Sequence, residues 1–409
     1  MKRRGFLFSA GGITAGLSLG LPFAFAETAA QDAEIRITQP FNGAVLHRRL
    51  KDPVVGVVEG TDGKPIALKI KVSGEAPPDA AVTVDGIASR RNGKTFEAEI
   101  ELRQKTNDIV VRAKLSSNEV KEARGRVLWL KNSVPRYCFG IDDTIFCLRE
   151  IHRNNYKSIF DDYFLGNLQK LNRQYGMKVT LNLFYTTSVE EILTAEREQF
   201  NLSQFSDKYK SEWRDNADWL RLAFHAKREF PDRPYKDASV ETLIGDYLEL
   251  EKEVKRFAGE ETYSPALVIH WNEIRPEMLK PLAAQGVKVL GAGTVGYPHD
   301  AVCREYLSKQ DFLLDADSGI VFMRRDLRVL NNEPLDNIVP ELEKTIVDPN
   351  TAEVVFFVTH EQYFWQFYKN YIPNHWKRLE RAFGYVTERG YKPVFINDET
   401  LGLDDTQFA

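Results

Sequence analysis

Side chains that can bind a metal ion or carry a proton stand at four places where an apolar run of the sequence ends. Two adjacent carboxylates, Asp142 and Asp143, end the run YCFGI, and His225 ends LRLAF. His270 follows ALVI, and His360 follows VVFFVT. The chain has only seven histidines, so three of them at such positions form a pattern that needs an explanation.

These residue types suit metal-assisted hydrolysis. One aspartate and two histidines can fill three positions of a tetrahedral zinc site and leave the fourth for water or substrate. A second carboxylate can then take a proton from the water, and a third histidine can return one to the leaving group. Taken singly, each residue has a simpler explanation, because strand-end histidines are often hydrogen-bonded and an aspartate pair can cap a helix.

The elements that must position these residues alternate between strands and amphipathic helices from residue 134 onward. Helices are expected over 158–175, ending at Gly176, over 238–259, capped by Ser239, and over 275–286 and 375–390. Strands are expected over 177–185, 266–272, 287–293, 353–362 and 391–397. This alternation predicts a parallel sheet wrapped by helices, open or closed into a barrel, with functional side chains at the carboxyl ends of the strands.

The segment 34–131 has a different pattern, with apolar residues at every second position and frequent turns. Tight turns are expected at Asp62-Gly63, Asp85-Gly86 and Asn92-Gly93. Short strands at such intervals predict an antiparallel β-sandwich. The segment resembles the bacterial immunoglobulin-like modules of secreted carbohydrate-active enzymes, and a spacer or packing role is favoured over glycan binding.

The first 26 residues have the composition of a signal peptide. A basic start leads into a Gly-rich apolar segment that ends in Ala24-Phe25-Ala26, an A-x-A cleavage pattern. Residues 3–7, RRGFL, resemble the twin-arginine export motif. We therefore expect a periplasmic or secreted protein with no integral membrane segment after cleavage. An uncleaved anchor is disfavoured because the apolar run is short and broken by glycine.

Length, net charge and cysteine content limit the number of domains, the kinds of partner and the disulfide bonds that the chain can have. A chain of 409 residues can hold two folded units. A formal net charge of -4 and the absence of a long basic run argue against a nucleic-acid partner. Three cysteines, Cys138, Cys147 and Cys303, lack zinc-type spacing, so we expect buried free thiols, with a bridge between the first two as the alternative. The sequence does not indicate an oligomeric state.

Residues 134–402 resemble the NodB-type polysaccharide deacetylases, which are built on a distorted β/α barrel. The family motif T-F-D-D-G corresponds to FGIDDT, which puts Asp142 in the role of the base and Asp143 in that of a metal ligand. The family's H-S/T-x-x-H motif retains His225, but Glu229 stands where the second histidine is expected. In the family, the histidine of the last motif, L-x-H, is the general acid, and here it corresponds to His360.

The chain departs from the family at three places: Thr144 replaces the motif glycine, the H-x-x-x-H pair is incomplete, and the motif R-x-P-Y is missing. VIHWNE lies where that last motif is expected, and we infer that His270 restores the lost ligand. The resemblance then implies an exported deacetylase that removes N-acetyl or other acyl groups from a glycan. Its divalent metal, most simply zinc, would be held by Asp143, His225 and His270.

Two further stretches can contribute to a sugar-binding cleft. PDRPYKDA offers Arg233 and Tyr235, while Trp271 and Tyr363 follow His270 and His360. Aromatic faces stack on sugar rings, although an aromatic-rich core explains each of these residues equally well. Beside His360, Glu361 is expected to orient that histidine rather than to act as a second carboxylate.

Two alternatives remain open at the level of sequence. A glycoside hydrolase or another sugar-modifying enzyme on the same scaffold would need a carboxylate facing Asp142, such as Glu273 or Glu361. A scaffold that has lost its chemistry would instead serve as a periplasmic glycan-binding protein. Product analysis and metal content separate these functions from deacetylation.

Overall fold

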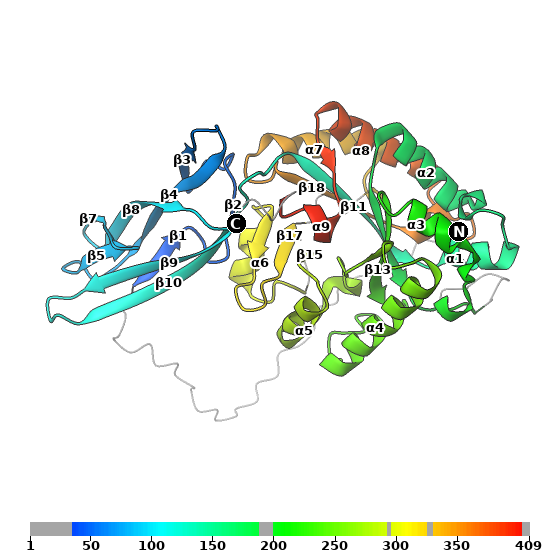
Figure 1. Cartoon of the computed structure of the whole chain (residues 1–409), viewed down its shortest axis with the longest axis horizontal. Helices are drawn as coiled ribbons and strands as arrows, with labels where there is room; N and C mark the ends of the chain where they lie inside the picture. Colours follow the sequence, from blue (N-terminus) through cyan, green and yellow to red (C-terminus); the bar gives the residue numbers. More distant parts are fainter. Residues whose placement is uncertain (1–34, 188–198, 293–295, 325–329, 403–409) are drawn as a thin grey trace, which may run out of the picture.

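The computed structural model describes residues 35–187, 199–292, 296–324 and 330–402 (Figure 1). The expected signal peptide over residues 1–26 lies outside these ranges, so its prediction stays open. Within the described ranges, no helix is both long and apolar enough to cross a bilayer.

Residues 36–129 form two β-sheets around their own apolar core, at one end of the molecule (Figure 1). One sheet has the order β1-β4-β8-β7 with β3 paired to β4, and the other has the order β2-β10-β9-β5-β6. Their strands are β1 (Arg36–Gln39), β2 (Val45–Leu46), β3 (Val54–Glu59), β4 (Pro65–Glu75), β5 (Ala81–Val84), β6 (Ile87–Ala88), β7 (Arg90–Asn92), β8 (Thr95–Leu102), β9 (Thr106–Lys114) and β10 (Val120–Trp129).

The sandwich follows directly from the alternating pattern of the sequence. In β8, Phe96, Ala98, Ile100 and Leu102 are buried and every residue between them is exposed, as a strand with one face on the core requires. At the turn after β5, Asp85 and Gly86 both have positive φ, which is the conformation of a two-residue hairpin turn.

The second part of the chain is a mixed α/β unit. Its main sheet is parallel throughout, with the order β14-β13-β12-β11-β18 and β19 also paired to β11. These strands are β11 (Arg136–Thr144), β12 (Val179–Phe184), β13 (Leu220–Ala226), β14 (Tyr263–Ser264), β18 (Val354–His360) and β19 (Lys392–Pro393). All nine residues of β11 are buried, so this central strand gives rigid support to the residues at its carboxyl end.

Helices cover this sheet on both faces, as Figure 1 shows for α2 and α8 on one side and α4 and α5 on the other. The α-helices are α1 (Phe146–Asn154), α2 (Tyr163–Tyr175), α3 (Lys210–Asp215), α4 (Val240–Phe257), α5 (Leu279–Ala284), α6 (Ala301–Leu307), α7 (Ile338–Val347), α8 (His375–Glu388) and α9 (Ile396–Glu399). The predicted Ser239 cap and Gly176 helix end are both confirmed. The helix expected over 158–175 is interrupted, because Asp162 caps α2 after a separate 3₁₀ turn.

A smaller three-stranded sheet stands beside the main one, with the order β15 (Val289–Ala292), β17 (Val321–Arg324) and β16 (Phe312–Leu314). Side chains join the two sheets where strand pairing is missing. Asn397 accepts from the backbone N–H groups of Lys288 and Val289 and donates to the carbonyls of Pro265 and Ala266. Among the described residues the two sheets are joined by side chains and no continuous strand pairing closes them into a barrel, so the expected mixed α/β unit is confirmed and the distorted barrel stays a prediction.

Two predicted strands are largely wrong. The segment 266–272 is extended but unpaired along most of its length, and His270 lies in a 3₁₀ turn, His270–Asn272. The segment 391–397 contributes only β19 to the sheet before α9 begins. Asn397 contributes to this, because its amide takes backbone partners at Pro265 and Ala266 that a neighbouring strand would use.

The sandwich packs directly on the smaller sheet. The N–H of Leu314 donates to the carbonyl of Gly43 at 2.7 Å, and a Cβ at Gly43 would lie 2.3 Å from the carbonyl oxygen of Leu314. Phe41 stacks on Tyr306 with ring centroids 4.2 Å apart. Close backbone approach at a glycine and ring stacking thus fix the sandwich against the α/β unit.

The cysteines are free thiols. Cys138 and Cys147 are both buried and unbridged, and Cys303 is partly exposed. The Sγ atom of Cys138 lies 3.1 Å from the hydroxyl of Thr400. The expected buried thiols are confirmed, and the alternative bridge does not form in this structure.

We expect Asn397→Leu to destabilise the protein by about 3 kcal/mol, because two buried N–H groups and two carbonyls lose their partner. Urea denaturation followed by circular dichroism measures this loss. Asp398→Asn, which removes a partly exposed ion pair with Arg221, is the matched control and should stay within about 0.5 kcal/mol of the wild type. Equal stability of the two variants would show that Asn397 does not hold the sheets together.

Candidate metal centre

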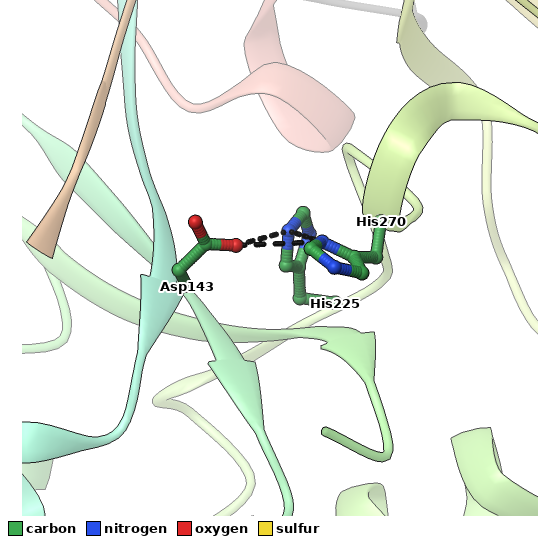
Figure 2. A group of neighbouring side chains, drawn as sticks. All are labelled: Asp143, His225 and His270. Carbon is green, nitrogen blue, oxygen red and sulfur yellow. Dashed lines mark hydrogen bonds and ion pairs between the residues drawn. The ribbon is translucent and has the colours of Figure 1, made fainter. Parts of the chain in front are cut away.

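Three side chains converge at the carboxyl ends of the main sheet. The Nε2 atom of His225 lies 3.1 Å from Oδ1 of Asp143, and Nδ1 of His270 lies 3.1 Å from that same Nε2 atom. The third side of the triangle, from His270 Nδ1 to Asp143 Oδ1, is 3.4 Å (Figure 2). Ligand atoms about 2.0–2.1 Å from a tetrahedral ion lie about 3.3–3.4 Å apart. These three residues therefore have the spacing of one face of a metal-binding tetrahedron.

The outer hydrogen bonds of the two histidines determine which nitrogen is bare when each ring is neutral, the form that binds a metal. His225 Nδ1 lies 2.7 Å from the carbonyl of Val268, and His270 Nε2 lies 3.2 Å from the carbonyl of Glu229. A carbonyl only accepts, so each outer nitrogen carries an N–H, and in the neutral ring each inner nitrogen presents a lone pair. Two lone pairs and a carboxylate then face one another, an arrangement that a bound cation stabilises.

Electrostatics keep the carboxylate of this group ionised. Burial acts to raise the pKa of Asp143, but His360, His225 and His270 outweigh it and hold the pKa well below its usual range. For His225, burial acts to lower the pKa, and the carboxylates of Asp142 and Asp143 outweigh it and raise the pKa. An ionised aspartate beside two imidazoles is a suitable donor set for zinc.

Irregular backbone conformations, two of them β-bulges, position the side chains of all three residues. In β11 the register slips between Ile141 and Thr144, so that Asp142 and Asp143 together face one residue of β12, and Asp143 has φ 58°. In β13 the corresponding slip makes His225 the extra residue. β-Bulges of this kind redirect side chains at sheet ends.

The third residue, His270, lies in a turn whose backbone is also irregular. Trp271 and Asn272, directly after His270, have φ 63° and 54°. The N–H of Tyr297 donates to the carbonyl of Asn272 at 3.1 Å, and a Cβ at Gly296 would lie 1.5 Å from that carbonyl oxygen. Close packing against Gly296 and Tyr297 thus holds the turn, and sequence patterning, which predicts a strand here, cannot reveal it.

The expected base and acid lie on neighbouring strands beside this group. Asp142 of β11 is paired in register with His360 of β18, and Nε2 of His360 lies 3.9 Å from Oδ2 of Asp143. Asp142 is buried, whereas the His360 side chain is one-third exposed. The structure therefore brings together all five residues that the sequence assigns to the metal and to proton transfer.

Two amide side chains that the sequence pattern did not single out orient the aspartates. Asn182 of β12 donates to Oδ1 of Asp142 at 2.7 Å, and Gln362 donates to Oδ2 of Asp143 at 3.1 Å. Both amides are buried. Their position near the carboxyl ends of β12 and β18 was the available signal, because polar residues at strand ends are candidates whatever their type.

Glu361 has a different role from the expected one. Its carboxylate accepts from the backbone N–H groups of Ile145, Phe146 and Cys147 at 2.6–2.7 Å, and the indole of Trp365 donates to it at 3.1 Å. The helix α1 has isoleucine at its N-cap and no side-chain cap from within. Glu361 caps this helix, so the expectation that it orients His360 is wrong.

The residues expected to contact substrate fall into two groups. Arg233 and Trp271 are exposed by 44% and 43%, and the guanidinium of Arg233 lies 5.6 Å from the centre of the Trp271 ring. Tyr235 is buried, with its hydroxyl 3.0 Å from both the N–H of Lys227 and the carboxylate of Asp246. This placement argues against a substrate contact for Tyr235. The half-buried Tyr363 packs with its ring centre 6.0 Å from that of His360.

Comparisons with known proteins do not identify a family. No family model matches the chain, and no curated protein matches it in sequence. Among solved structures, a 4-alpha-glucanotransferase from Thermococcus litoralis is 14% identical with a TM-score of 0.43, covering 64% of this chain and 39% of that one. A polysaccharide deacetylase from Bacillus cereus is 10% identical with a TM-score of 0.23, covering 72% of this chain and 94% of that one.

A Bacteroides ovatus xyloglucanase is a third such structure, 10% identical with a TM-score of 0.20, covering 79% of this chain and 65% of that one. This chain spans less than half of the glucanotransferase. Similarities at these TM-scores carry no argument about function. The functional conclusion therefore depends on the geometry of the site.

We expect the metal-free protein to bind one Zn²⁺ per chain by isothermal titration calorimetry, with the ion retained in elemental analysis after gel filtration. His270→Gln should weaken binding by roughly tenfold or more, because one of three ligands is lost. His299→Gln is the matched control, since this half-buried histidine lies outside the group. Equal zinc affinity in both variants would place the metal elsewhere.

Proposed function

We propose that this protein is an exported, metal-dependent hydrolase that removes an acyl group, most simply N-acetyl, from a sugar unit of a glycan. The observation that carries the proposal is the triangle of Asp143, His225 and His270, with sides of 3.1–3.4 Å. A carboxylate and a further histidine, Asp142 and His360, lie beside it on adjacent strands. Three ligands, a base and an acid form the set that metal-assisted amide hydrolysis needs.

The three ligand residues fit a divalent cation, and zinc suits two imidazoles and one carboxylate best. When bound, such an ion polarises the acyl carbonyl and lowers the pKa of a water molecule. The chain contributes the orientation of the donors, through the carbonyls of Val268 and Glu229 and the amide of Gln362. Partners of this kind fix the tautomer and basicity of the ligands.

Proton transfer would be divided between Asp142 and His360. Asp142, held by Asn182, accepts the proton of the attacking water as its oxygen adds to the acyl carbon. The carbon–nitrogen bond then breaks, and the departing amine takes a proton from Nε2 of His360. The products are acetate and a free amino sugar, and both groups return to their starting states by proton exchange with solvent.

The structure disfavours the glycoside hydrolase alternative. Both oxygens of Glu361 accept hydrogen bonds from the start of α1, so this carboxylate is held away from a substrate. Glu273 lies 3.7 Å from Arg233 and 3.8 Å from Lys236 in ion pairs. Neither glutamate is placed as the unengaged partner of Asp142 that glycoside hydrolysis requires.

The exposed pair Arg233 and Trp271 supports a sugar-binding role next to the metal site. Trp271 directly follows the ligand His270, yet it keeps a strained left-handed backbone and an exposed ring. Such strain in a bulky residue persists where function needs it. We infer that the indole face stacks on a sugar ring while Arg233 contacts polar substituents.

Asp142→Asn should lower the rate of acetate release from N-acetylated oligosaccharides by about 10²–10⁴-fold, because the base is lost. Zinc content should remain unchanged, since the substitution leaves the three ligands in place. Acetate is measured by an enzyme-coupled assay and the sugar products by mass spectrometry. Asp79→Asn, an exposed residue of the sandwich, is the control.

Shortened sugar chains among the products would exclude pure deacetylation. Full activity of Asp142→Asn would remove the proposed base. Glycan binding that persists after chelation, together with no acetate release by the wild type, would favour a non-catalytic binding protein.

Trp271→Ala should raise KM for an oligosaccharide roughly tenfold and leave kcat within about twofold, because a stacking contact binds substrate and transition state alike. Leu248→Ala, an equally exposed apolar residue at 45% on α4, is the matched control. An unchanged KM in Trp271→Ala would exclude the stacking role.

A further inference from the structure

A chain of hydrogen bonds runs from the buried His375 to the proposed acid His360. His375 Nε2 lies 2.7 Å from the hydroxyl oxygen of Thr359, and that hydroxyl donates to Oδ1 of Asn331 at 3.2 Å. The same Asn331 oxygen lies 3.3 Å from Nδ1 of His360. None of these contacts involves a ligand of the metal centre, and none follows from the family resemblance.

The direction of each bond in this chain is fixed by chemistry. Burial, reinforced by Arg378, lowers the pKa of His375 to about 3, so its ring is neutral. Because the Thr359 proton goes to Asn331, the Thr359 oxygen accepts from Nε2–H of His375. The amide oxygen of Asn331 has no proton to give, and His360 must therefore donate to it from Nδ1.

The orientation of the Asn331 amide has independent support. Its Nδ2 atom donates to the side-chain oxygen of Asn332 at 3.3 Å, which leaves Oδ1 directed at Thr359 and His360. The backbone is held as well, since the guanidinium of Arg378 donates to the carbonyls of Leu330 and Asn331 at 2.9 and 3.1 Å. Arg378 lies on α8, the helix that begins with His375, so one helix supplies the first residue of the chain of hydrogen bonds and holds the backbone of Asn331 within it.

We infer that Asn331 is the positioning residue that fixes the tautomer of His360. With Nδ1–H committed to Asn331, Nε2 is the nitrogen that exchanges protons, and this atom faces Asp143 at the metal centre. The catalytic benefit rests on the proposed function, whereas the tautomer itself does not. Asn331 does this without a charge, unlike the carboxylate that more often orients a histidine.

The tautomer can be read directly by ¹⁵N NMR of the zinc-loaded full chain carrying ¹⁵N-labelled histidine. At a pH where His360 is neutral, we expect its Nδ1 signal to be that of a protonated nitrogen and its Nε2 signal that of a bare one. The spectrum of His360→Gln assigns these signals by their loss. A proton on Nε2, or the tautomer mixture of free histidine, would overturn the inference.

Kinetics supply the second measurement. Asn331→Leu should lower kcat for acetate release about 10–100-fold, as loss of a ring-orienting partner does, with KM within about twofold. Asn331→Asp keeps an acceptor oxygen at the same place and should recover most of that loss. Asn167→Leu, a partly exposed asparagine on α2, is the matched control.

An unchanged kcat in Asn331→Leu, a loss confined to KM, or no recovery in Asn331→Asp would overturn the positioning role. If Asn331→Leu fails to fold, the wild-type NMR measurement still decides the tautomer. If the wild type releases no acetate from any sugar, the proposed function fails, and the NMR spectra of the wild type and of Asn331→Leu still test separately whether Asn331 fixes the tautomer: an unchanged Nδ1–H tautomer in Asn331→Leu would overturn its role.

Discussion

The buried carboxylate of Glu361 at the start of α1 is the interaction on which the geometry of the site depends. Three backbone N–H groups that lack a local cap converge on it, and the helix dipole favours a negative charge there. Burial raises the pKa of Glu361, while these N–H groups act to lower it. Because Glu361 directly follows His360, and α1 begins just after Asp143, this contact ties the proposed acid and one residue of the candidate metal centre into one rigid edge.

Strained backbone does the remaining positioning. In a regular strand, Asp142 and Asp143 would point to opposite faces of the sheet. The bulge in β11 and the left-handed conformation of Asp143 bring both to the same site. A second bulge at His225 and the left-handed Trp271 act in the same way. Each such residue costs about 1–3 kcal/mol, which the fully buried β11 and its neighbours offset through packing.

Periodicity predicted the sandwich, several parallel strands and four of the nine α-helices that the structure describes, α2, α4, α5 and α8, because each of these buries one face with a regular repeat. Residue type at the strand ends singled out the three residues that converge, Asp143, His225 and His270, together with Asp142 and His360. The sequence misplaced the role of Glu361 and did not reveal how the two sheets are joined, since both depend on single side chains that replace backbone partners. Asn397 bridges the two sheets through its side-chain amide. In the sequence it resembles any other asparagine, and no local pattern indicates this role.

The residues proposed for proton transfer and metal binding are oriented by side chains of one type. Asn182, Gln362 and Asn331 orient Asp142, Asp143 and the proposed acid, respectively, and all three are amides. Amides direct a hydrogen bond without adding charge, so the negative charge around the two imidazoles comes from Asp142, Asp143 and Glu229, whose Oε2 atom lies 3.9 Å from Nε2 of His270. A cation held by Asp143, His225 and His270 would be stabilised by that charge, and the neutral amides would orient its ligands without competing for it.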